Sequence, residues 1–409
     1  MSSLRQVEAM LGRESMGVVH GLPGVPVASP SSVDEAREIV QCLTKDRVKF
    51  ALLGRGSKLG WAALVQKPTL AISTAKLSGV VEFEPGDGVM TALAGTTLAE
   101  LEGIVRPHGL RITPAVPRAD NATLGGVIAA GQSGTDRLLH GAMRLHLLGT
   151  RLLQLNGQST RSGGQLVKNV SGYDIHRLLA GSFGSLGLIT QASLRLMTCP
   201  EDRWLCTSQS ATPAPLVQLA TQLLESGIRS EALIIEGAGD AWQLHLSLVG
   251  RRGHVEAERK LVAALLPASD SLGGEAAHTR LEALRESEPD WHAGDVVQVA
   301  LKRSRLSHGL ETVMDSGFVG KQSQYRIHPG LATIQVRLQS ALSAENLRQL
   351  RTSLQALSAQ VSLKRPTPLT EEFLPRVVDP VRARLVARLR QTYDPQNLLC
   401  TRPPLEPIQ

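Results

Sequence analysis

The chain has 409 residues, of which 42% are hydrophobic and 20% charged, and its formal net charge at pH 7 is +7. This length predicts two domains with separate cores, and the composition is typical of a folded globular chain rather than a disordered one. Aromatic residues make up 3% of the chain, which disfavours nucleic-acid binding by stacked aromatic platforms. The lysines and arginines are spread along the chain, so we expect no nucleic-acid partner. A positive net charge also suits an anionic cofactor or an anionic substrate.

The cysteines form no Cys-x-x-Cys pair, which argues against a metal or iron–sulfur site in this chain and favours buried, reduced thiols. The N-terminus lacks the charged segment and apolar stretch of a secretory signal. No apolar run of about 18 residues is present, so no membrane span is predicted. The expected location is the cytoplasm, or the surface of the inner membrane if partner subunits dock the chain there.

The first half of the chain predicts a small α/β unit. Capping boxes at Ser32–Glu35 and Thr97–Glu100 begin helices, and Asn156-Gly157 is a strong hairpin turn. Pro85-Gly86-Asp87-Gly88 is a second hairpin turn. The remaining expectations are strands at 49–53, 69–72, 80–84, 89–94, 143–155 and 187–197, and helical segments at 124–130 and 174–179.

The second half predicts two β-α-β-β-α units, which indicate a ferredoxin-like, largely antiparallel sheet with helices on one face. The segment from Pro267 to Asp290 is rich in Ser, Gly and Glu, so we expect a connecting loop there. A helix at 381–390 is expected to return the chain to the first domain. The predicted strands are 204–208, 232–236, 243–249, 296–301, 322–327, 331–338 and 360–363, and the helices are 216–226, 255–265, 305–315 and 344–357.

Three glycine-rich segments are candidates for binding phosphate. They are Gly54–Lys58, directly after an apolar run, then Pro117–Gly134 and Gly163–Thr190. Glycine lets another group approach the main chain, and exposed N–H groups in such segments bind anions. The first segment is neither a P-loop nor a dinucleotide fingerprint. Glycines that only make turns are the alternative, which is disfavoured because these glycines stand among apolar residues.

In this order, the segments resemble the FAD-binding domain of the vanillyl-alcohol oxidase / p-cresol methylhydroxylase (PCMH) family, and within it the FAD-binding subunits of glycolate oxidases. The resemblance covers roughly residues 25–200. Its most specific part is Lys168–Asp174 joined to Gly181–Thr190. It implies an α+β fold with a two-part PCMH-type FAD-binding domain at residues 1–202. A ferredoxin-like antiparallel cap domain would follow at 203–375, and residues 376–409 would return to the FAD domain.

The resemblance also implies FAD as the cofactor. The first segment has no histidine, where some relatives attach the flavin, so noncovalent FAD is expected; His140 and His146 are interpreted as structural. Tyr173 is a candidate cofactor contact, and a role in packing alone is an equal alternative. The predicted cofactor-binding residues are Gly54, Arg55, Gly56, Ser57, Lys58, Pro117, Ala122, Thr123, Gly125, Gly126, Gly134, Tyr173 and Ile189.

Oxidation of a 2-hydroxy acid needs a base for the hydroxyl proton and a cation for the carboxylate. Relatives that act alone carry a metal-binding His-x-Gly-Asp-Gly-Asn motif, and the segments beginning at His245 and His328 lack its carboxylate. No metal is therefore expected. Arg326 and His328 are catalytic candidates. The more ordinary interpretation is that they only lie at the edge of a surface strand. The family's C-terminal motif is matched from Asp394 to Leu399 but not beyond.

These features predict an FAD-dependent oxidoreductase acting on CH–OH groups, as the FAD-binding subunit of a multi-subunit glycolate oxidase. Its substrate would be a small 2-hydroxy acid. The expected partners are a catalytic flavoprotein subunit and an iron–sulfur subunit that takes the electrons. Two alternatives stay open: a self-contained FAD-dependent alcohol or hydroxy-acid oxidoreductase, and a structural subunit that has lost the flavin.

Overall fold

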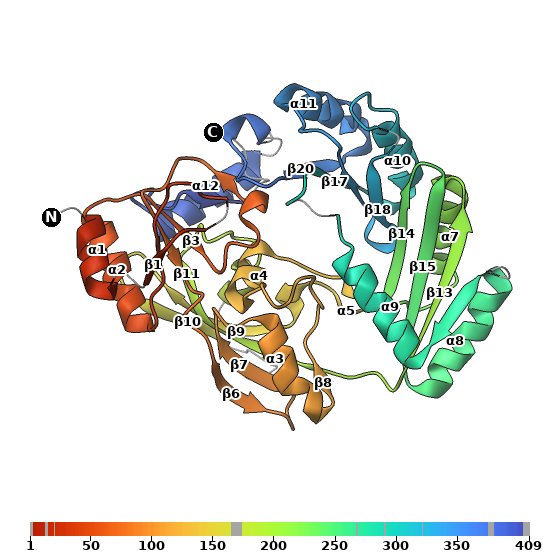
Figure 1. The fold of residues 1–409 in the computed structure, drawn as a ribbon, viewed down its shortest axis with the longest axis horizontal. Helices are drawn as coiled ribbons and strands as arrows, with labels where there is room; N and C mark the ends of the chain where they lie inside the picture. The colour runs from red at the N-terminus through yellow and green to blue at the C-terminus, as the bar shows by residue number, and fades with distance from the viewer. Residues whose placement is uncertain are drawn as a thin grey trace. The chain divides into compact units, whose positions relative to one another are not determined.

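The computed structural model describes residues 3–12, 15–19, 21–164, 174–266, 269–289, 292–320, 322–374 and 380–403. The chain divides into two compact units, coloured in chain order in Figure 1. The first unit comprises Met1–Gln132, Ala142–Cys199 and Thr367–Gln409, and the second comprises Ser133–Gly141 and Pro200–Pro366. The expected domain limits, after residues 202 and 375, lie near the changes of unit at residues 199 and 366, and the short segment 133–141 joins the second unit.

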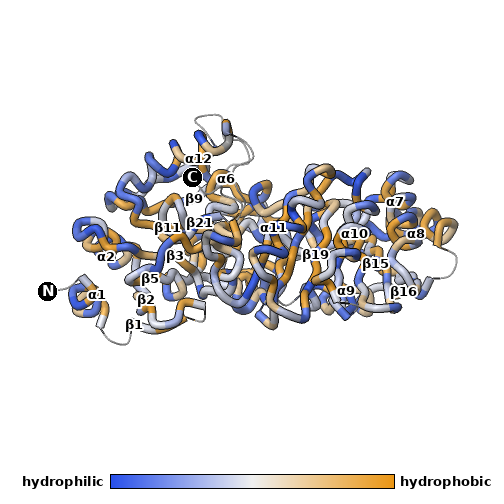
Figure 2. Tube along the Cα trace, turned by 90° about the horizontal axis from the view of Figure 1, so that it is seen from above, coloured by the Kyte–Doolittle hydropathy of each residue, from blue (hydrophilic) through white to orange (hydrophobic). Residues whose placement is uncertain are grey.

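A four-stranded sheet in the order β1-β2-β5-β3 begins the first unit, with β2 and β3 parallel to β5. Its strands are β1 (Met16–Gly17), β2 (Val27–Ala28), β3 (Phe50–Leu53) and β5 (Leu70–Ser73). Helix α1 (Ser3–Leu11) precedes β1, and helix α2 (Val33–Lys45) lies between β2 and β3 in the chain. Helix α2 buries Ile39 and Leu43 against hydrophobic residues of β3 and β5, and both strands are hydrophobic in Figure 2. Ser32 caps α2 as expected, while the Glu35 carboxylate accepts from Ser31.

A five-stranded antiparallel sheet in the order β10-β9-β11-β7-β6 completes the core of this unit. Its strands are β6 (Val80–Glu84), β7 (Val89–Leu93), β9 (Leu147–Leu153), β10 (Ser159–Gly163) and β11 (Leu188–Arg195). Helices α3 (Leu98–Val105) and α4 (Leu124–Ala130) pack on one face of it through Leu101, Leu124 and Ile128. The capping box of α3, Thr97 with Glu100, forms as predicted.

The remaining elements of this unit are short, apart from one helix of 14 residues near the C-terminus. They are η2 (Leu59–Trp61), β4 (Ala63–Leu64), η3 (Arg106–His108), β8 (Leu110–Arg111), η4 (Met143–Leu145), α6 (Ile175–Leu178), β12 (Met197–Thr198), η8 (Glu371–Phe373), α12 (Pro380–Tyr393) and β21 (Thr401–Arg402). The C-terminal segment lies beside β3: the N–H of Phe50 donates to the carbonyl of Leu398, and the N–H of Cys400 donates back to Phe50, both at 3.0 Å.

The second unit is an eight-stranded sheet, antiparallel throughout, in the order β16-β13-β15-β14-β18-β19-β17-β20. Its strands are β13 (Asp202–Ser210), β14 (Ala232–Ala238), β15 (Ala241–Gly250), β16 (Asp270–Gly273), β17 (Val296–Ala300), β18 (Gln324–His328), β19 (Thr333–Arg337) and β20 (Gln360–Lys364). Its helical elements are α5 (Arg137–His140), α7 (Pro213–Glu225), α8 (Arg252–Leu265), α9 (Gly274–Glu286), η5 (Arg303–Arg305), α10 (Leu306–Met314), η6 (Pro329–Leu331), α11 (Ala344–Ser353) and η7 (Gln355–Leu357). The predicted pair of β-α-β-β-α units is confirmed.

Two expectations were wrong. The expected loop at 267–290 contains β16 and α9, and α9 lies on the side of the sheet opposite α7 and α8 (Figure 1). Ala277, Leu281 and Leu284 recur at helical spacing and are buried, a pattern that the surrounding Ser, Gly and Glu obscure. The strand expected from Met143 is preceded by the 3-10 turn η4, and β9 begins only at Leu147.

Candidate functional site

Two of the three glycine-rich segments, and the end of the third, meet in one groove of the first unit. The loop Gly54–Lys58 follows β3, Thr123 caps α4, and the third segment runs through Phe183 and Gly184 into β11. The groove is lined by Leu52, Leu53, Gly54, Arg55, Gly56, Ser57, Lys58, Thr74, Thr123, Gly125, Gly126, Ala129, Ala130, Phe183, Gly184, Gly187, Leu188 and Ile189. The polar loop and the small residues of α4 thus surround the same space.

Glycine is required at close contacts that these segments make. A β-carbon on Gly54 would lie 2.1 Å from Oγ1 of Thr123, and one on Gly125 would lie 2.7 Å from the β-carbon of Ala94. Gly56 has φ +77°, a left-handed conformation that side chains rarely adopt. Close packing of the backbone, rather than turn formation alone, explains why the glycines stand among apolar residues.

The loop Gly54–Lys58 has the features of an anion site. Within the described residues, the N–H groups of Gly56 and Ser57 donate to no other group of the chain. Arg55 Nη1 donates to the carbonyl of Asp120 over 3.0 Å, which ties the loop to the segment before α4. Free N–H groups beside cationic side chains suit a diphosphate, so these residues fit a phosphate-bearing cofactor.

The structure brings most of the predicted cofactor-binding residues to this groove. Those that line it are Gly54, Arg55, Gly56, Ser57, Lys58, Thr123, Gly125, Gly126 and Ile189. Pro117 and Ala122 are buried and do not line it, and Gly134 belongs to the second unit. Tyr173 lies outside the described residues. The role of each as a cofactor contact stays a prediction.

Several residues that line the groove were not among the predicted cofactor contacts, and Thr74 and Phe183 are two of them. Thr74 follows β5, which lies parallel to β3, and the carboxyl ends of adjacent parallel strands meet at a common edge where ligands bind. That rule could have identified it from the predicted strands. Phe183 has φ +52°, and its carbonyl accepts from Oγ1 of Thr401 over 2.8 Å. The C-terminal segment therefore supports the groove, although it lacks the end of the family motif.

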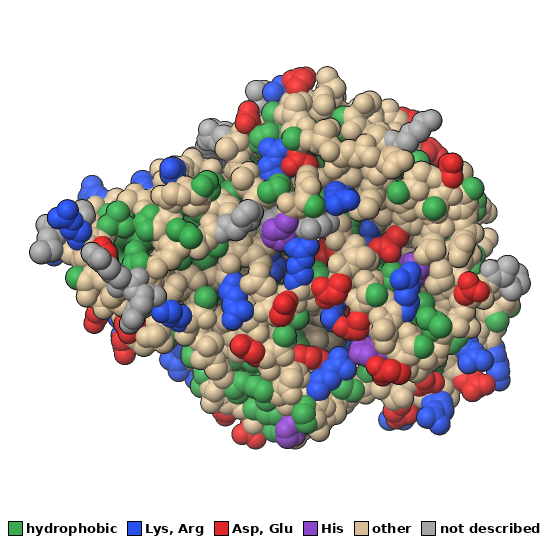
Figure 3. Space-filling view, in the orientation of Figure 1, with side chains coloured by type: hydrophobic (Ala, Val, Ile, Leu, Met, Phe, Trp, Pro, Cys, Tyr) green, Lys and Arg blue, Asp and Glu red, His purple; other side chains and the backbone are tan. Residues whose placement is uncertain are grey.

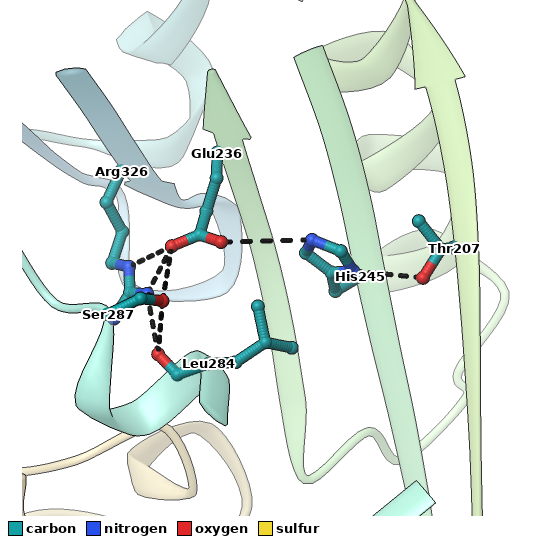
Figure 4. Close-up of polar contacts among 6 residues, drawn as sticks. All are labelled: Thr207, Glu236, His245, Leu284, Ser287 and Arg326. Carbon is teal, nitrogen blue, oxygen red and sulfur yellow. Dashed lines mark hydrogen bonds and ion pairs between the residues drawn. The ribbon is translucent and has the colours of Figure 1, made fainter. Parts of the chain in front are cut away.

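The catalytic candidate Arg326 lies in a buried cluster of the second unit (Figure 4). Its side chain is 2% exposed. Nε donates to Glu236 Oε1 over 2.9 Å, and Nη2 donates to Glu236, to the carbonyl of Leu284 over 2.6 Å and to Ser287 Oγ over 2.8 Å. The guanidinium is already bound by its own unit, so these contacts give no support to a role in holding a substrate carboxylate, which stays a prediction.

Two histidines of this unit, His245 and His328, have a lowered pKa. His245 is 1% exposed; Nδ1 lies 3.0 Å from Oγ1 of Thr207, and Nε2 lies 3.9 Å from Oε2 of Glu236 (Figure 4). Burial, with Arg280 and Arg326 nearby, lowers the pKa of His245 to about 3. Burial also lowers the pKa of His328, the second catalytic candidate, to about 3, helped by Arg326, Arg137 and Lys364. An imidazole with this pKa is a weak base at neutral pH.

Within the described residues, the buried cysteines, the arrangement of potential metal ligands and the surface charges point to no second functional site. Burial raises the pKa of the thiols of Cys206 and Cys400 to about 12, as expected for inert buried thiols. In the described part of the chain, no group of three or more His, Cys, Asp or Glu side chains is arranged to hold a metal. None of the described helices has the length and hydropathy that crossing a bilayer requires. Lys and Arg are interspersed with Asp and Glu on the face drawn in Figure 3.

Comparison with known proteins identifies the cofactor. The sequence profile described as "FAD binding domain" matches residues 26–163. Glycolate oxidase subunit GlcE of Escherichia coli is 30% identical over 226 residues, which cover 55% of this chain and 63% of the relative. D-lactate dehydrogenase of Archaeoglobus fulgidus is 33% identical over 170 residues, which cover 42% of this chain and 38% of the relative. The chain thus spans less than two thirds of the length of these relatives.

The fold matches that of solved structures. p-Cresol methylhydroxylase superposes with a TM-score of 0.78 at 13% identity, over 99% of this chain and 96% of that one. Alkyldihydroxyacetonephosphate synthase superposes with a TM-score of 0.72 at 14% identity, over 97% of this chain and 84% of that one. The predicted α+β fold is confirmed, as are the likeness to glycolate oxidase subunits and the cofactor FAD. The chain therefore has the PCMH-type fold, and its residues 26–163 match the profile of FAD-binding domains.

Proposed function

We propose that this chain is an FAD-dependent oxidoreductase that acts on the CH–OH group of small 2-hydroxy acids, as the FAD-carrying subunit of a multi-subunit glycolate oxidase. The observation that carries the proposal is the groove between Gly54–Lys58, Thr123–Gly126 and Ile189, in a chain that is 30% identical to a glycolate oxidase subunit. The proposal includes the expected location in the cytoplasm, or at the inner membrane through partners.

Each part of the groove has a defined task in this proposal. The N–H groups of Gly56 and Ser57 and the cation of Lys58 would hold the diphosphate of FAD, because an anion compensates these donors. Gly125 lets α4 pack closely against Ala94, and Ile189 would contact the cofactor from β11. Bound noncovalently, FAD supplies the acceptor for the hydride of the hydroxy acid.

We also propose that the base and the carboxylate-binding cation come from a catalytic flavoprotein subunit, and that an iron–sulfur subunit takes the electrons. Two observations support this division. Nε and Nη2 of Arg326 donate to groups of its own unit, and the low pKa of His328 makes it a poor base. A 2-hydroxy acid would then react only in the assembled oxidase.

The similarity to D-lactate dehydrogenase supports a second candidate, a self-contained FAD-dependent dehydrogenase of hydroxy acids. The subunit and the self-contained enzyme differ in where the substrate reacts. A self-contained enzyme would reduce its flavin when D-lactate or glycolate is added, whereas a subunit would need its partners. A structural subunit without flavin is the remaining alternative.

The test is the visible spectrum of the purified chain, loaded with FAD, before and after anaerobic addition of glycolate and D-lactate. We expect flavin bands that persist with the chain alone. Co-expression with the proteins encoded beside it should give a complex whose flavin bleaches with glycolate. Bleaching of the isolated chain would establish the self-contained enzyme, and a chain that takes up no FAD would be the structural subunit. If no complex forms and glycolate oxidation is not supported, the subunit proposal is wrong.

A further inference from the structure

One face of the five-stranded sheet changes from apolar to polar along its strands. Leu153 and Leu188 form a cross-strand pair on this face, and both pack into the core with α2 and β3. Further along the sheet, on the same face, Arg151 pairs with Gln191 and with Arg161. The three side chains therefore lie in one row across β10, β9 and β11. This row lies beyond the part of the face that packs against α2 and β3.

Next to this row the face is hollow. Gly149 and Gly163 are paired across β9 and β10, so neither strand places a side chain there. A β-carbon on Gly149 would lie 2.8 Å from the backbone N of Gly164, so the position admits only glycine. The hollow is a cavity of about 200 Å³, lined by Val81, Glu82, Thr91, Gly149, Thr150, Arg151, Arg161, Gly164, Gln191, Ala192 and Ser193.

The wall of this cavity is polar. Thr91 and Ser193 are 2% and 8% exposed, and their hydroxyl groups are hydrogen-bonded to each other at 2.8 Å. The cavity shares no lining residue with the cofactor groove. Its volume corresponds to about six water molecules, which is too little for a nucleotide but enough for a small organic or inorganic ion.

The charges of the cavity are unbalanced. Two arginines and one glutamate, Glu82, line it. Arg151 and Arg161 stand directly opposite each other, and like charges in this arrangement destabilise a sheet. In the described part of the chain, neither guanidinium forms an ion pair or a hydrogen bond. An anion between them would remove the repulsion and accept bidentate hydrogen bonds from both.

We propose that this cavity binds a small polyanion through its carboxylate or phosphate groups, held between Arg151 and Arg161 with the Gln191 amide as a further donor. The site lies in the first unit and is separate from the FAD groove. It does not depend on which reaction the flavin performs. A ligand here would be recognised by charge and by the narrow space above Gly149.

The experiment is calorimetric titration of the FAD-loaded chain with inorganic phosphate and, separately, with succinate. Loading with FAD keeps the cofactor groove from binding either probe. We expect one of the two anions to bind with a dissociation constant of about 1 mM or lower, and the anion that binds identifies the group recognised. Arg161→Gln should weaken binding at least about tenfold, as expected for loss of a charge-assisted hydrogen bond.

Arg151→Glu is the decisive variant, because it places opposite charges across the two strands. It should abolish anion binding while its midpoint of thermal unfolding without anion stays equal to or above that of the unmodified chain. Added anion should raise that midpoint for the unmodified chain only. Arg144→Gln, at an exposed arginine of η4, is the matched control and should bind normally. Absence of binding for both anions, or normal binding by Arg151→Glu, would overturn the proposal.

Discussion

A β-carbon on Gly54 would lie 2.1 Å from Oγ1 of Thr123, the residue that caps α4. These residues are far apart in the chain, yet the backbone of the loop after β3 lies directly against the side chain of Thr123 at the start of α4. Oγ1 of Thr123 also accepts from the N–H of Gly126 over 3.3 Å. The contact therefore sets both the position of the loop and the first turn of the helix.

Gly54→Ala should lower FAD retention at least about tenfold, because the added methyl group must push the loop away from Thr123. Flavin absorbance after gel filtration of the reconstituted chain measures this. The double variant Gly54→Ala/Thr123→Ala should recover part of the binding, since it removes the clashing hydroxyl. Gly86→Ala is the control, because a β-carbon there has no neighbour within 4 Å. Equal FAD retention in Gly54→Ala and the unmodified chain would contradict the prediction.

Glu236→Gln should lower the free energy of unfolding by about 3 kcal/mol, because it leaves the guanidinium of Arg326 buried without its counter-charge. Urea unfolding followed by far-ultraviolet circular dichroism measures the loss. The exposed pair Glu345–Arg348 is the comparison, and Glu345→Gln should cost less than about 1 kcal/mol. The double variant Glu236→Gln/Arg326→Met should be more stable than Glu236→Gln. If it is not, the buried charge is not the cause.

The buried His245 should make stability depend on pH. Its pKa in the folded chain is about 3, whereas an unfolded histidine titrates near 6.5. Between these values His245 is protonated in the unfolded chain but neutral in the folded chain. The contribution of neutral His245 to stability is therefore complete above pH 6.5 and is lost as the pH falls toward 3. The expected loss is about 1.4 kcal/mol for each pH unit once the unfolded histidine is protonated.

Urea unfolding of the unmodified chain and of His245→Gln at pH 7.5, 6 and 5 tests this dependence. The variant should show a shallower fall, with the remaining slope due in part to His328, whose pKa is lowered to a similar value. His308→Gln, at an exposed position of α10, should leave the slope unchanged. Parallel pH curves for His245→Gln and the unmodified chain would rule out the assignment.

Asp394 should stabilise both the C-terminal segment and the cofactor groove. Its Oδ1 and Oδ2 accept from the N–H groups of Leu398 and Leu399 over 2.7 and 2.9 Å, and Thr401 beyond them donates to the carbonyl of Phe183. Asp394→Ala leaves two buried N–H groups without acceptors, at a cost of about 2–4 kcal/mol, and should weaken FAD retention. Glu84→Ala, on the exposed side of β6, serves as control. Unchanged stability would show that water replaces the carboxylate.

Much of the fold could be predicted from neighbours in the sequence. Thr97 and Glu100 form their capping box within one helical turn, and Asn156-Gly157 joins β9 to β10 as expected. The glycine loop at Gly54–Lys58 followed a clear strand and was placed correctly in the groove. These features depend on residues a few positions apart, so local spacing and residue type suffice to predict them.

Other features depend on segments that are distant in the chain. Arg326 donates hydrogen bonds to Glu236, ninety positions away in the chain, and to the carbonyl of Leu284. Leu284 lies on a helix that was expected to be a loop. Thr74 reaches the groove because β5 pairs with β3, and Phe183 is held by Thr401. The sequence alone determined most of the helices and strands and the glycine loops that suit a diphosphate. Only the tertiary structure decided which side chains meet, because the packing of the sheets brings together buried polar groups from distant segments, and local spacing does not specify these pairs.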